Sequence, residues 1–332
     1  MKTIRVVVVS SENTPPSWGW IAKHIDTFDW SFFKPPKVKS FQLVFYRIIT
    51  AFKAVRKAAQ SDVLVSHGPY TAFYCALFKW LLRVRTPHIV YSFNFSELPQ
   101  GFAIKRMSFA FNKIDRFVVS SHMEIDLYSD YFNLPANKFD FVRWGVNFPE
   151  FNNRPPKHDA DYICAVGGNA RDYATFIDTM RDLPHIPAIV VVRPYNLVGL
   201  QIPDNVTVLT NIPKDEAFSV IANSRLMVLP LAGNEIPCGH ITLVVAYYLG
   251  IPSIVTNSSG IEDYVTDPET ALLCAPGSKE SMLQAVTRLW QDPGLCKEIS
   301  QNCGHFAQTL CSEQNYVDHF KHFIEQRVTN ND

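Results

Sequence analysis

The chain has 332 residues, of which 47% are hydrophobic and 19% are charged, a composition typical of folded proteins and not of disordered ones. Lysine plus arginine and aspartate plus glutamate number 31 each, so the net charge is zero at pH 7. This balance conceals a split, because residues 1–158 carry 21 basic against 11 acidic side chains and residues 159–332 carry 10 against 20. We therefore expect two parts of the chain with different partners.

Cysteine usage and apolar runs narrow the class of protein further. The seven cysteines form no C-x-x-C pair, so the sequence predicts neither a disulfide framework nor a zinc site, and it fits a reducing compartment. The valine run at residues 6–9 is too short for the apolar region of a signal peptide, and no apolar run is long enough to cross a bilayer. We therefore expect a cytoplasmic protein without a metal site, with peripheral binding to the inner face of the membrane as an added hypothesis.

Residues 1–150 alternate short apolar runs with stretches of helical spacing. The apolar runs predict buried strands at Ile4–Val9, Val63–Val65, His88–Tyr91 and Phe117–Val119. Helices are predicted at residues 42–59, 71–82, 101–112 and 121–132. Residues 148–158 are rich in proline and asparagine and have no periodicity, so we predict a linker at residues 151–158.

The same alternation begins again in residues 159–332. Strands are predicted at Tyr162–Val166, Ala188–Val192, Val206–Leu209, Arg225–Leu229 and Ser253–Val255, and the last helices at residues 279–290, 294–309 and 313–327. Strands that alternate with helices imply parallel sheets with right-handed crossovers. We therefore predict an α/β fold of two Rossmann-like domains, residues 1–150 and 159–332, whose parallel sheets face each other across a cleft.

A glycine pair and an arginine follow the first predicted strand of the second domain. Gly167 and Gly168 allow a ligand to approach the backbone closely. Arg171 lies at the start of the following helix, where free amides and the helix dipole favour an anion, and its guanidinium can chelate a diphosphate. A salt bridge from Arg171 to Asp172 or Asp178 is the alternative.

The stretch EIPCGHITLVVAYYLG, residues 235–250, predicts a loop and then a helix that begins near Thr242. Gly239 allows close approach, Thr242 can cap the helix, and the amide of Ile241 is a donor available to a phosphate. His240 is a candidate to contact phosphate or sugar hydroxyls, and a structural role is the alternative.

These motifs, followed by Gly260–Val265 and Thr270–Gly277, occur in an order that resembles the nucleotide-sugar-binding half of GT-B glycosyltransferases, most closely the retaining group called family 4. Residues 117–122 and 141–147 add a weaker match in the first half. The resemblance implies transfer of a sugar from a nucleoside-diphosphate sugar to a hydroxyl group of a lipid-linked, polysaccharide or other glycan acceptor. It also implies retention of anomeric configuration. We expect no metal or other cofactor, because fixed cations and amides can neutralise the departing diphosphate.

Three more residues are assigned to the donor. Arg193 follows the second strand of the domain and faces the predicted cleft. The resemblance places Ile212 in the loop that contacts the base of the nucleotide. It also matches Glu262 to an acid near the sugar, and a solvated loop residue is the alternative there.

The sequence departs from the family at one point. Family 4 members usually carry two glutamates eight positions apart, which fall here on Pro237 and Val245. Glu235 is the candidate to replace the first of these acids. We therefore include Glu235, together with His240, among the candidate catalytic residues.

Polar and aromatic residues of the first domain lie at the predicted ends of strands. Trp18 is in the first loop, His67 follows the second strand, and Asn94 and Glu97 follow the third. Loops at the carboxyl ends of parallel strands line the cleft, so we place Trp18, Asn94 and Glu97 on the acceptor side and His67 in the candidate catalytic set. A capping or structural role is the alternative for each of them.

Two segments of the basic half mix aromatic residues with lysine and arginine: residues 30–39, continuing toward 52–57, and residues 73–85. Such segments suit an anionic membrane surface, and ordinary helices with a cationic solvated rim are the alternative. Nucleic acid is not a predicted partner, because no recognition module is visible in the sequence.

The leading hypothesis is a glycosyltransferase of the hexosyltransferase type. Two alternatives stay open at this point. One is an epimerase that acts on a nucleotide-sugar with the same architecture. The other is a binding or regulatory subunit that has kept the fold without turnover, which the missing glutamates make reasonable.

Overall fold

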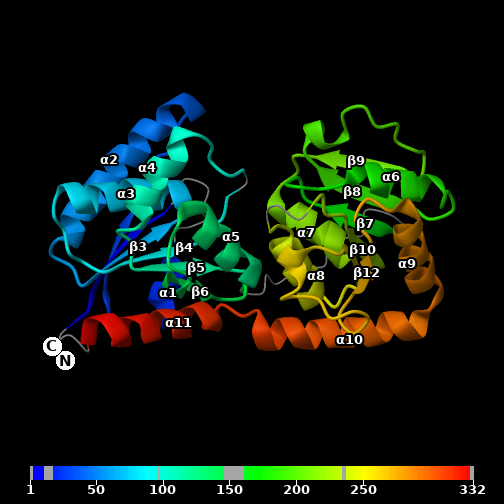
Figure 1. The fold of residues 1–332 in the computed structure, drawn as a ribbon. Helices are drawn as coiled ribbons and strands as arrows, with labels where there is room; N and C mark the ends of the chain where they lie inside the picture. Colours follow the sequence, from blue (N-terminus) through cyan, green and yellow to red (C-terminus); the bar gives the residue numbers. More distant parts are fainter. Residues whose placement is uncertain (1–2, 11–17, 96, 146–160, 234–236, 330–332) are drawn as a thin grey trace. The chain divides into compact units, whose positions relative to one another are not determined.

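The computed structural model describes residues 3–10, 18–95, 97–145, 161–233 and 237–329. The chain forms two compact units, Met1–Val142 with Gln314–Asp332, and Arg143–Glu313. Each unit holds a six-stranded parallel sheet with helices packed on both faces (Figure 1). The predicted α/β class with two Rossmann-like domains is confirmed. The predicted linker at residues 151–158 lies outside the described residues.

The sheet of the first unit has the strand order β2-β1-β3-β4-β5-β6. Its strands are β1 Arg5–Val9, β2 Asp29–Phe33, β3 Val63–His67, β4 His88–Tyr91, β5 Arg116–Val119 and β6 Phe139–Phe141. The valines of β1 explain why the strand is a continuous apolar run. Val6 and Val8 pack into the core on one face of the sheet, and Val7 and Val9 pack into the core on the other. A strand covered on both faces has no side that favours polar residues.

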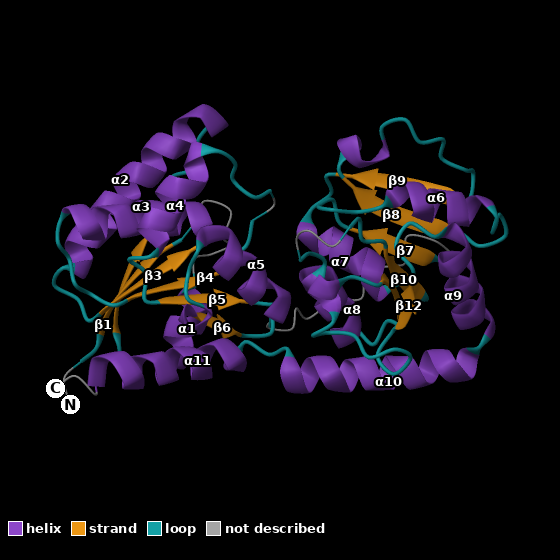
Figure 2. Cartoon of the chain, viewed as in Figure 1, coloured by secondary structure: helices purple, strands orange, loops and turns teal. Residues whose placement is uncertain are grey.

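Helices cover both faces of this sheet (Figure 2). One face is covered by α2 Ser40–Ala58, α3 Pro69–Leu81, α4 Phe102–Phe111 and α5 His122–Phe132. The other face is covered by α1 Gly19–His24 and α11 Gln314–Ile324, and a single π-helical turn, Glu325–Thr329, follows α11.

The last helix belongs to the first unit, whereas the sequence prediction placed it with residues 159–332. Val317, Phe320, Phe323 and Ile324 of α11 are buried in the core of the first unit. Phe320 is fully buried, and its ring lies 5.3 Å from that of Trp18 and 5.8 Å from that of Trp30. Apolar spacing identifies the buried face of a helix but not the core that buries it. The sequence prediction therefore places α11 in the same domain as the residues that precede it.

The sequence pattern does not predict strand β2, because residues 30–33 resemble the start of a basic amphiphilic segment. In the structure Asp29–Phe33 is an edge strand that pairs in parallel with β1. Its aromatic side chains are only partly covered, and Phe32 is 40% exposed. The stacked rings of Trp30 and Phe32, 5.9 Å apart, give this strand the packing that aromatic residues favour in a sheet.

The sheet of the second unit has the strand order β12-β11-β10-β7-β8-β9. Its strands are β7 Ile163–Val166, β8 Ala188–Val192, β9 Val206–Thr210, β10 Leu226–Leu229, β11 Ser253–Thr256 and β12 Leu272–Cys274. Its helices are α6 Tyr173–Arg181, α7 Lys214–Ala222, α8 His240–Tyr248, α9 Lys279–Gln291 and α10 Pro293–Leu310. The order reverses between β7 and β10, and the carboxyl ends of strands at such a reversal are where open α/β sheets hold ligands.

We expect the substitution Phe320→Ala to lower the free energy of unfolding of the first unit by about 3–5 kcal/mol, because it leaves a cavity between two tryptophan rings. Lys321→Ala, one position along the same helix and exposed, is the control and should change stability by less than about 0.5 kcal/mol. Denaturant unfolding followed by tryptophan fluorescence measures both. Equal stabilities of the two variants would show that α11 is not part of this core.

Candidate functional site

Two loops meet at the carboxyl edge of the second sheet, at the reversal between β7 and β10. Arg171 and Leu231 form an antiparallel bridge. On either side of it the amide of Asp172 donates to the carbonyl of Pro230 over 3.0 Å, and that of Ala232 donates to the carbonyl of Ala170 over 3.0 Å. The loop after β7 is thereby fixed to the loop after β10, and both are held against the ends of buried strands.

Arg171 lies across Gly167, which has a φ of +124°. A Cβ atom on Gly167 would lie 2.8 Å from Nη2 of Arg171, so any other residue would displace the guanidinium. Nη1 of Arg171 donates to the carbonyl of Asn169 over 2.7 Å, and among the described residues Nε has no hydrogen-bond partner. The guanidinium is thus positioned mainly by packing and keeps N–H donors for a ligand.

The salt-bridge alternative for Arg171 is not what the described residues show. Asp172 is the N-cap of α6, and its carboxylate accepts from the amide of Thr175 over 3.0 Å. Asp178 pairs with Arg181. Arg171 therefore precedes the N-cap instead of lying inside the helix, and the N-terminus of α6 is satisfied by its own carboxylate.

Arg193 lies over the second glycine of the pair. A Cβ atom on Gly168 would lie 3.0 Å from Cγ of Arg193 and 3.1 Å from Oδ1 of Asn196. The amide nitrogen of Asn196 donates to the carbonyl of Gly168 over 2.8 Å, and its oxygen accepts from the backbone amide of Arg193 over 3.1 Å. Asn196 thus fixes the loop after β8 to the loop after β7. The sequence does not indicate this role of Asn196, because a short polar residue after a strand carries no signal of its hydrogen-bond partner.

Helix α8 begins at His240 with Gly239 as its N-cap, two residues before the predicted start at Thr242. Gly239 has a φ of +94° and has no side chain that could cap the first turn. A Cβ atom there would lie 3.0 Å from Cδ2 of Leu229, so close packing also favours glycine. Thr242 is buried and Ile241 is 50% exposed. The amides of the first turn, which have no partner within the helix, form an uncapped positive end.

Arg171 and the start of α8 are close together. Nη1 of Arg171 lies 3.8 Å from Sγ of Cys238, the residue that directly precedes the N-cap Gly239. Burial raises the pKa of the Cys238 thiol and the guanidinium of Arg171 opposes that shift. The site therefore combines one guanidinium with an open helix N-terminus, and among the described residues no carboxylate lies within ion-pair distance of that guanidinium.

His240 is buried and ties α8 to the turn that follows β11. Its Nε2 lies 2.6 Å from the carbonyl oxygen of Gly260, and its ring stacks on Tyr264 with the centroids 4.6 Å apart. Because a carbonyl can only accept, Nε2 carries the hydrogen. Burial lowers the pKa of His240, although the bond to Gly260 and the charge of Asp263 oppose the shift. The structure thus gives His240 a neutral ring in a structural contact, and no described contact tests the catalytic role.

The structure also describes two other predicted donor residues of the second unit. Ile212 is half-buried and packs on the core, whereas Glu262 is exposed at the end of a short 3-10 turn, Ser259–Ile261. Glu235 lies outside the described residues. Val245 is buried in the core of the unit.

In the first unit, the structure brings Trp18 and His67 together. Their rings lie 5.0 Å apart in an edge-on arrangement, and His67 is only 3% exposed. Burial lowers the pKa of His67 to about 3, so its imidazole is neutral. Asn94 and Glu97 are exposed in the loop after β4, and within the described part of the chain no contact joins either of them to Trp18 or His67.

Neither a metal-binding cluster nor a membrane-spanning helix occurs in the described part of the chain. Among the described residues no group of three or more His, Cys, Asp and Glu side chains could hold a metal ion. None of the helices in the described ranges combines the length and the apolar character that a bilayer crossing requires.

Comparison with known proteins gives a family match in the second unit. Residues 198–305, which include β9, β10, β11, β12 and α8, match the family described as Glycosyl transferases group 1. No curated protein has a sequence that matches the chain.

Solved structures match nearly the whole chain at low identity. Sucrose-phosphate synthase from Thermosynechococcus elongatus is 14% identical with a TM-score of 0.75, covering 97% of this chain and 98% of its own. Anabaena HepE in complex with UDP is 12% identical with a TM-score of 0.75, covering 97% and 100%. WaaG, a glycosyltransferase involved in lipopolysaccharide biosynthesis, is 12% identical with a TM-score of 0.65, covering 95% and 99%. The family match is confined to residues 198–305, and the solved structures share the GT-B fold with nearly the whole chain.

Proposed function

We propose that this protein transfers a sugar from a nucleoside-diphosphate sugar to a hydroxyl acceptor, and that the diphosphate binds between Arg171 and the N-terminus of α8. The observation that carries the proposal is the guanidinium of Arg171 beside the uncapped start of that helix. Both groups belong to rigid elements at the reversal of strand order. Oriented amides and a guanidinium are the groups that recognise phosphate oxygens.

The same groups would serve the chemical step. When the bond between the sugar and the diphosphate breaks, negative charge grows on the departing phosphate. Arg171 and the amides of the first turn of α8 would stabilise that charge without moving, which is the usual source of electrostatic catalysis, and Arg193 would add a second guanidinium. Because Arg171 and the amides are held in place, we propose that transfer does not require a metal ion.

Two further parts of the proposal rest on resemblance: the anomeric configuration of the product and the class of acceptor. Retention of configuration follows from the likeness to family 4, with the acceptor hydroxyl attacking on the face from which the diphosphate leaves. HepE has been solved with UDP and with UDP-glucose, so UDP-sugars are the first donors to test here. The WaaG match supports a glycan or lipid-linked acceptor, which we propose for this chain.

An anionic membrane surface is the proposed location of the acceptor. Aromatic and aliphatic side chains are exposed on three helices that pack side by side, and we call this set the α2–α4 surface: Phe41, Val44, Phe45, Tyr70, Trp80, Leu81, Phe102 and Phe109. Cations lie among them, with Arg47 over the ring of Tyr70 at 5.7 Å and Lys113 over that of Phe109 at 5.2 Å. Exposed rings beside cations match the interface of an anionic bilayer.

Purified protein incubated with a panel of nucleotide-sugars tests the function directly. We expect slow hydrolysis of one donor, accelerated when a matching acceptor is added, because water replaces the acceptor in its absence. Chromatography of the released nucleoside diphosphate measures both rates. Interconversion of sugar isomers would instead indicate an epimerase, and binding without turnover would indicate a regulatory subunit.

We expect Arg171→Ala to weaken binding of the matching nucleoside diphosphate about tenfold to a hundredfold, since it removes a charge-assisted contact to phosphate. Arg181→Ala is the control, because Arg181 is exposed, carries the same charge and pairs with Asp178 on the surface. Titration calorimetry measures both affinities. An unchanged affinity of Arg171→Ala would refute the proposed diphosphate site.

We expect the double change Phe41→Ser with Phe45→Ser to lower binding to anionic vesicles about tenfold, because it removes two exposed rings from the α2–α4 surface. Val198→Ser, at a position that is 80% exposed in the second unit, is the control. Cosedimentation at low ionic strength measures the bound fraction. If vesicles fail to bind the unchanged protein, or bind all three proteins equally, the proposed membrane surface is wrong.

A further inference from the structure

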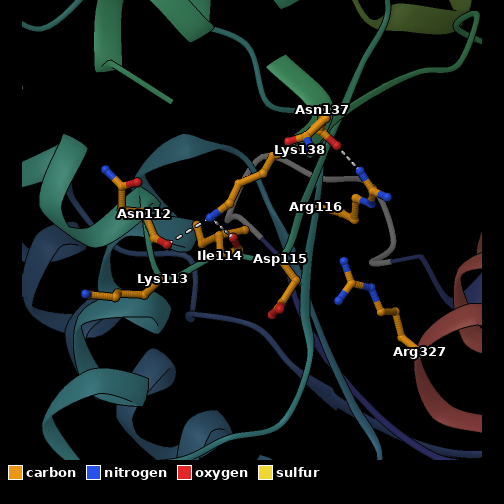
Figure 3. A pocket seen from close by; sticks show the side chains of 8 residues that line it. All are labelled: Asn112, Lys113, Ile114, Asp115, Arg116, Asn137, Lys138 and Arg327. Carbon is orange, nitrogen blue, oxygen red and sulfur yellow. Dashed lines mark hydrogen bonds between the residues drawn. The ribbon is translucent and has the colours of Figure 1, made fainter. Parts of the chain in front are cut away.

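A basic pocket lies at the amino edge of the sheet in the first unit (Figure 3). Its volume is about 340 Å³, within the range of small-ligand sites. It is lined by Asn112, Lys113, Ile114, Asp115, Arg116, Asn137, Lys138 and Arg327. Arg116 is the first residue of β5, and Asn137 and Lys138 directly precede β6. The pocket therefore lies at the opposite edge of the sheet from His67, which ends β3.

Four cations and one carboxylate line this pocket, and the carboxylate already serves a buried lysine. Oδ2 of Asp115 accepts from the amide of His88 over 2.8 Å and lies 3.5 Å from Nζ of Lys79. Lys79 is 6% exposed, so Asp115 compensates a charge that is held inside the unit. The one carboxylate of the pocket is thus shared between the buried Lys79 and the cations of the pocket, which outnumber it.

Lys138 and Arg116 are fixed in place by neighbouring carbonyl groups, and Arg116 also forms an ion pair in which its Nε lies 3.7 Å from Oδ2 of Asp140 on β6. Nζ of Lys138 donates to the carbonyls of Asn112 and Ile114 over 2.9 Å each, and Nη1 of Arg116 donates to the carbonyl of Asn137. An ammonium and a guanidinium each have more donors than these bonds use. Burial lowers the pKa of Lys138, and the charges of Lys113 and Arg327 lower it further, whereas Asp115 opposes them. The cations thus repel one another across the pocket.

The remaining cation comes from the end of the chain. Arg327 lies in the π-helical turn Glu325–Thr329 after α11, which packs in this unit. Figure 3 shows its guanidinium turned toward Arg116, whereas Lys113 points away from the other cations. Residues from β5, from the turn before β6 and from the C-terminal segment therefore converge on one space, and an anion in that space would contact all three.

We propose that this pocket binds a phosphate-bearing ligand, held by Arg116 and Lys138 on one side and Arg327 on the other, and that the ligand fastens the C-terminal segment to the first unit. A guanidinium pair with an ammonium is a common arrangement for a phosphate or diphosphate group. The site is separate from the proposed donor site, which belongs to the second unit. Its ligand is either a phosphorylated solute or the phosphate of a lipid headgroup.

The test is titration calorimetry of the full chain with pyrophosphate at low ionic strength, in the Arg171→Ala background so that the proposed donor site does not contribute. We expect one saturable site. Adding Arg327→Gln should weaken it about tenfold, because Arg327 supplies a charge-assisted contact. Lys53→Gln is the matched control, since Lys53 is exposed on α2 and does not line the pocket, and it should change the affinity less than twofold. A flat titration, or equal effects of Arg327→Gln and Lys53→Gln, would overturn the proposal.

Two further measurements identify the source of the phosphate and guard against misfolding. Hydrogen exchange of residues 325–329 in the otherwise unchanged protein should slow when pyrophosphate is added, and an unchanged rate would contradict the proposed fastening. Vesicles containing phosphatidic acid form the second arm. If Arg327→Gln weakens their binding as it weakens that of pyrophosphate, the ligand is a headgroup. If it weakens only the binding of pyrophosphate, the ligand is a soluble phosphate compound.

Discussion

The packing of the Arg171 guanidinium against Gly167 is the contact on which the proposed donor site depends. A flexible arginine at a loop would lose considerable side-chain entropy on binding a ligand. Here the glycine surface, the carbonyl of Asn169 and the clamp between the loops after β7 and β10 hold the side chain in place before any ligand arrives. The glycine pair is therefore required on steric grounds, because Gly168 gives Arg193 the same space that Gly167 gives Arg171.

A second constraint is the helix that returns from the second unit to the first. The rings of Trp18 and Trp30 pack against Phe320 of α11, and the ring of Tyr91 packs against His319 of the same helix. Tyr91 also hydrogen-bonds to Nδ1 of His319 over 2.9 Å, and Nε2 of His319 lies 3.2 Å from Asp140 on β6. The end of the chain is thus part of the first core, and this places Arg327 near the start of β5. The apolar face of α11 already attaches the end of the chain to the first unit. A ligand in the basic pocket would add a second attachment through Arg327.

The fold could be predicted from sequence wherever a segment is buried on both sides. Strands such as β4 and β8 were predicted with the bounds that the structure has, because a run of apolar residues between turns leaves little freedom. Strand β2, which lies at the edge of the sheet and is only partly buried, has a weaker pattern and is not predicted from the sequence. The start of α8 was predicted two residues late, because an N-cap glycine with positive φ has no side chain that signals the cap. Contacts between residues distant in sequence, such as that of His240 with Gly260, depend on tertiary packing, which no local sequence pattern encodes.

The charge split of the chain clarifies how each proposed site would attract an anion. The second unit, residues 143–313, carries 18 acidic against 11 basic side chains, so its net charge does not attract a nucleoside-diphosphate sugar over long range. At physiological ionic strength, however, charges beyond about 8 Å are largely screened. The phosphates would respond mainly to the groups that they touch, which at this site are guanidiniums and aligned amides. The first half has the opposite balance, and its excess of cations would draw anionic surfaces from a distance as well as bind phosphate at short range. The acidic half thus depends on precise local geometry, and the basic half on the sum of its charge.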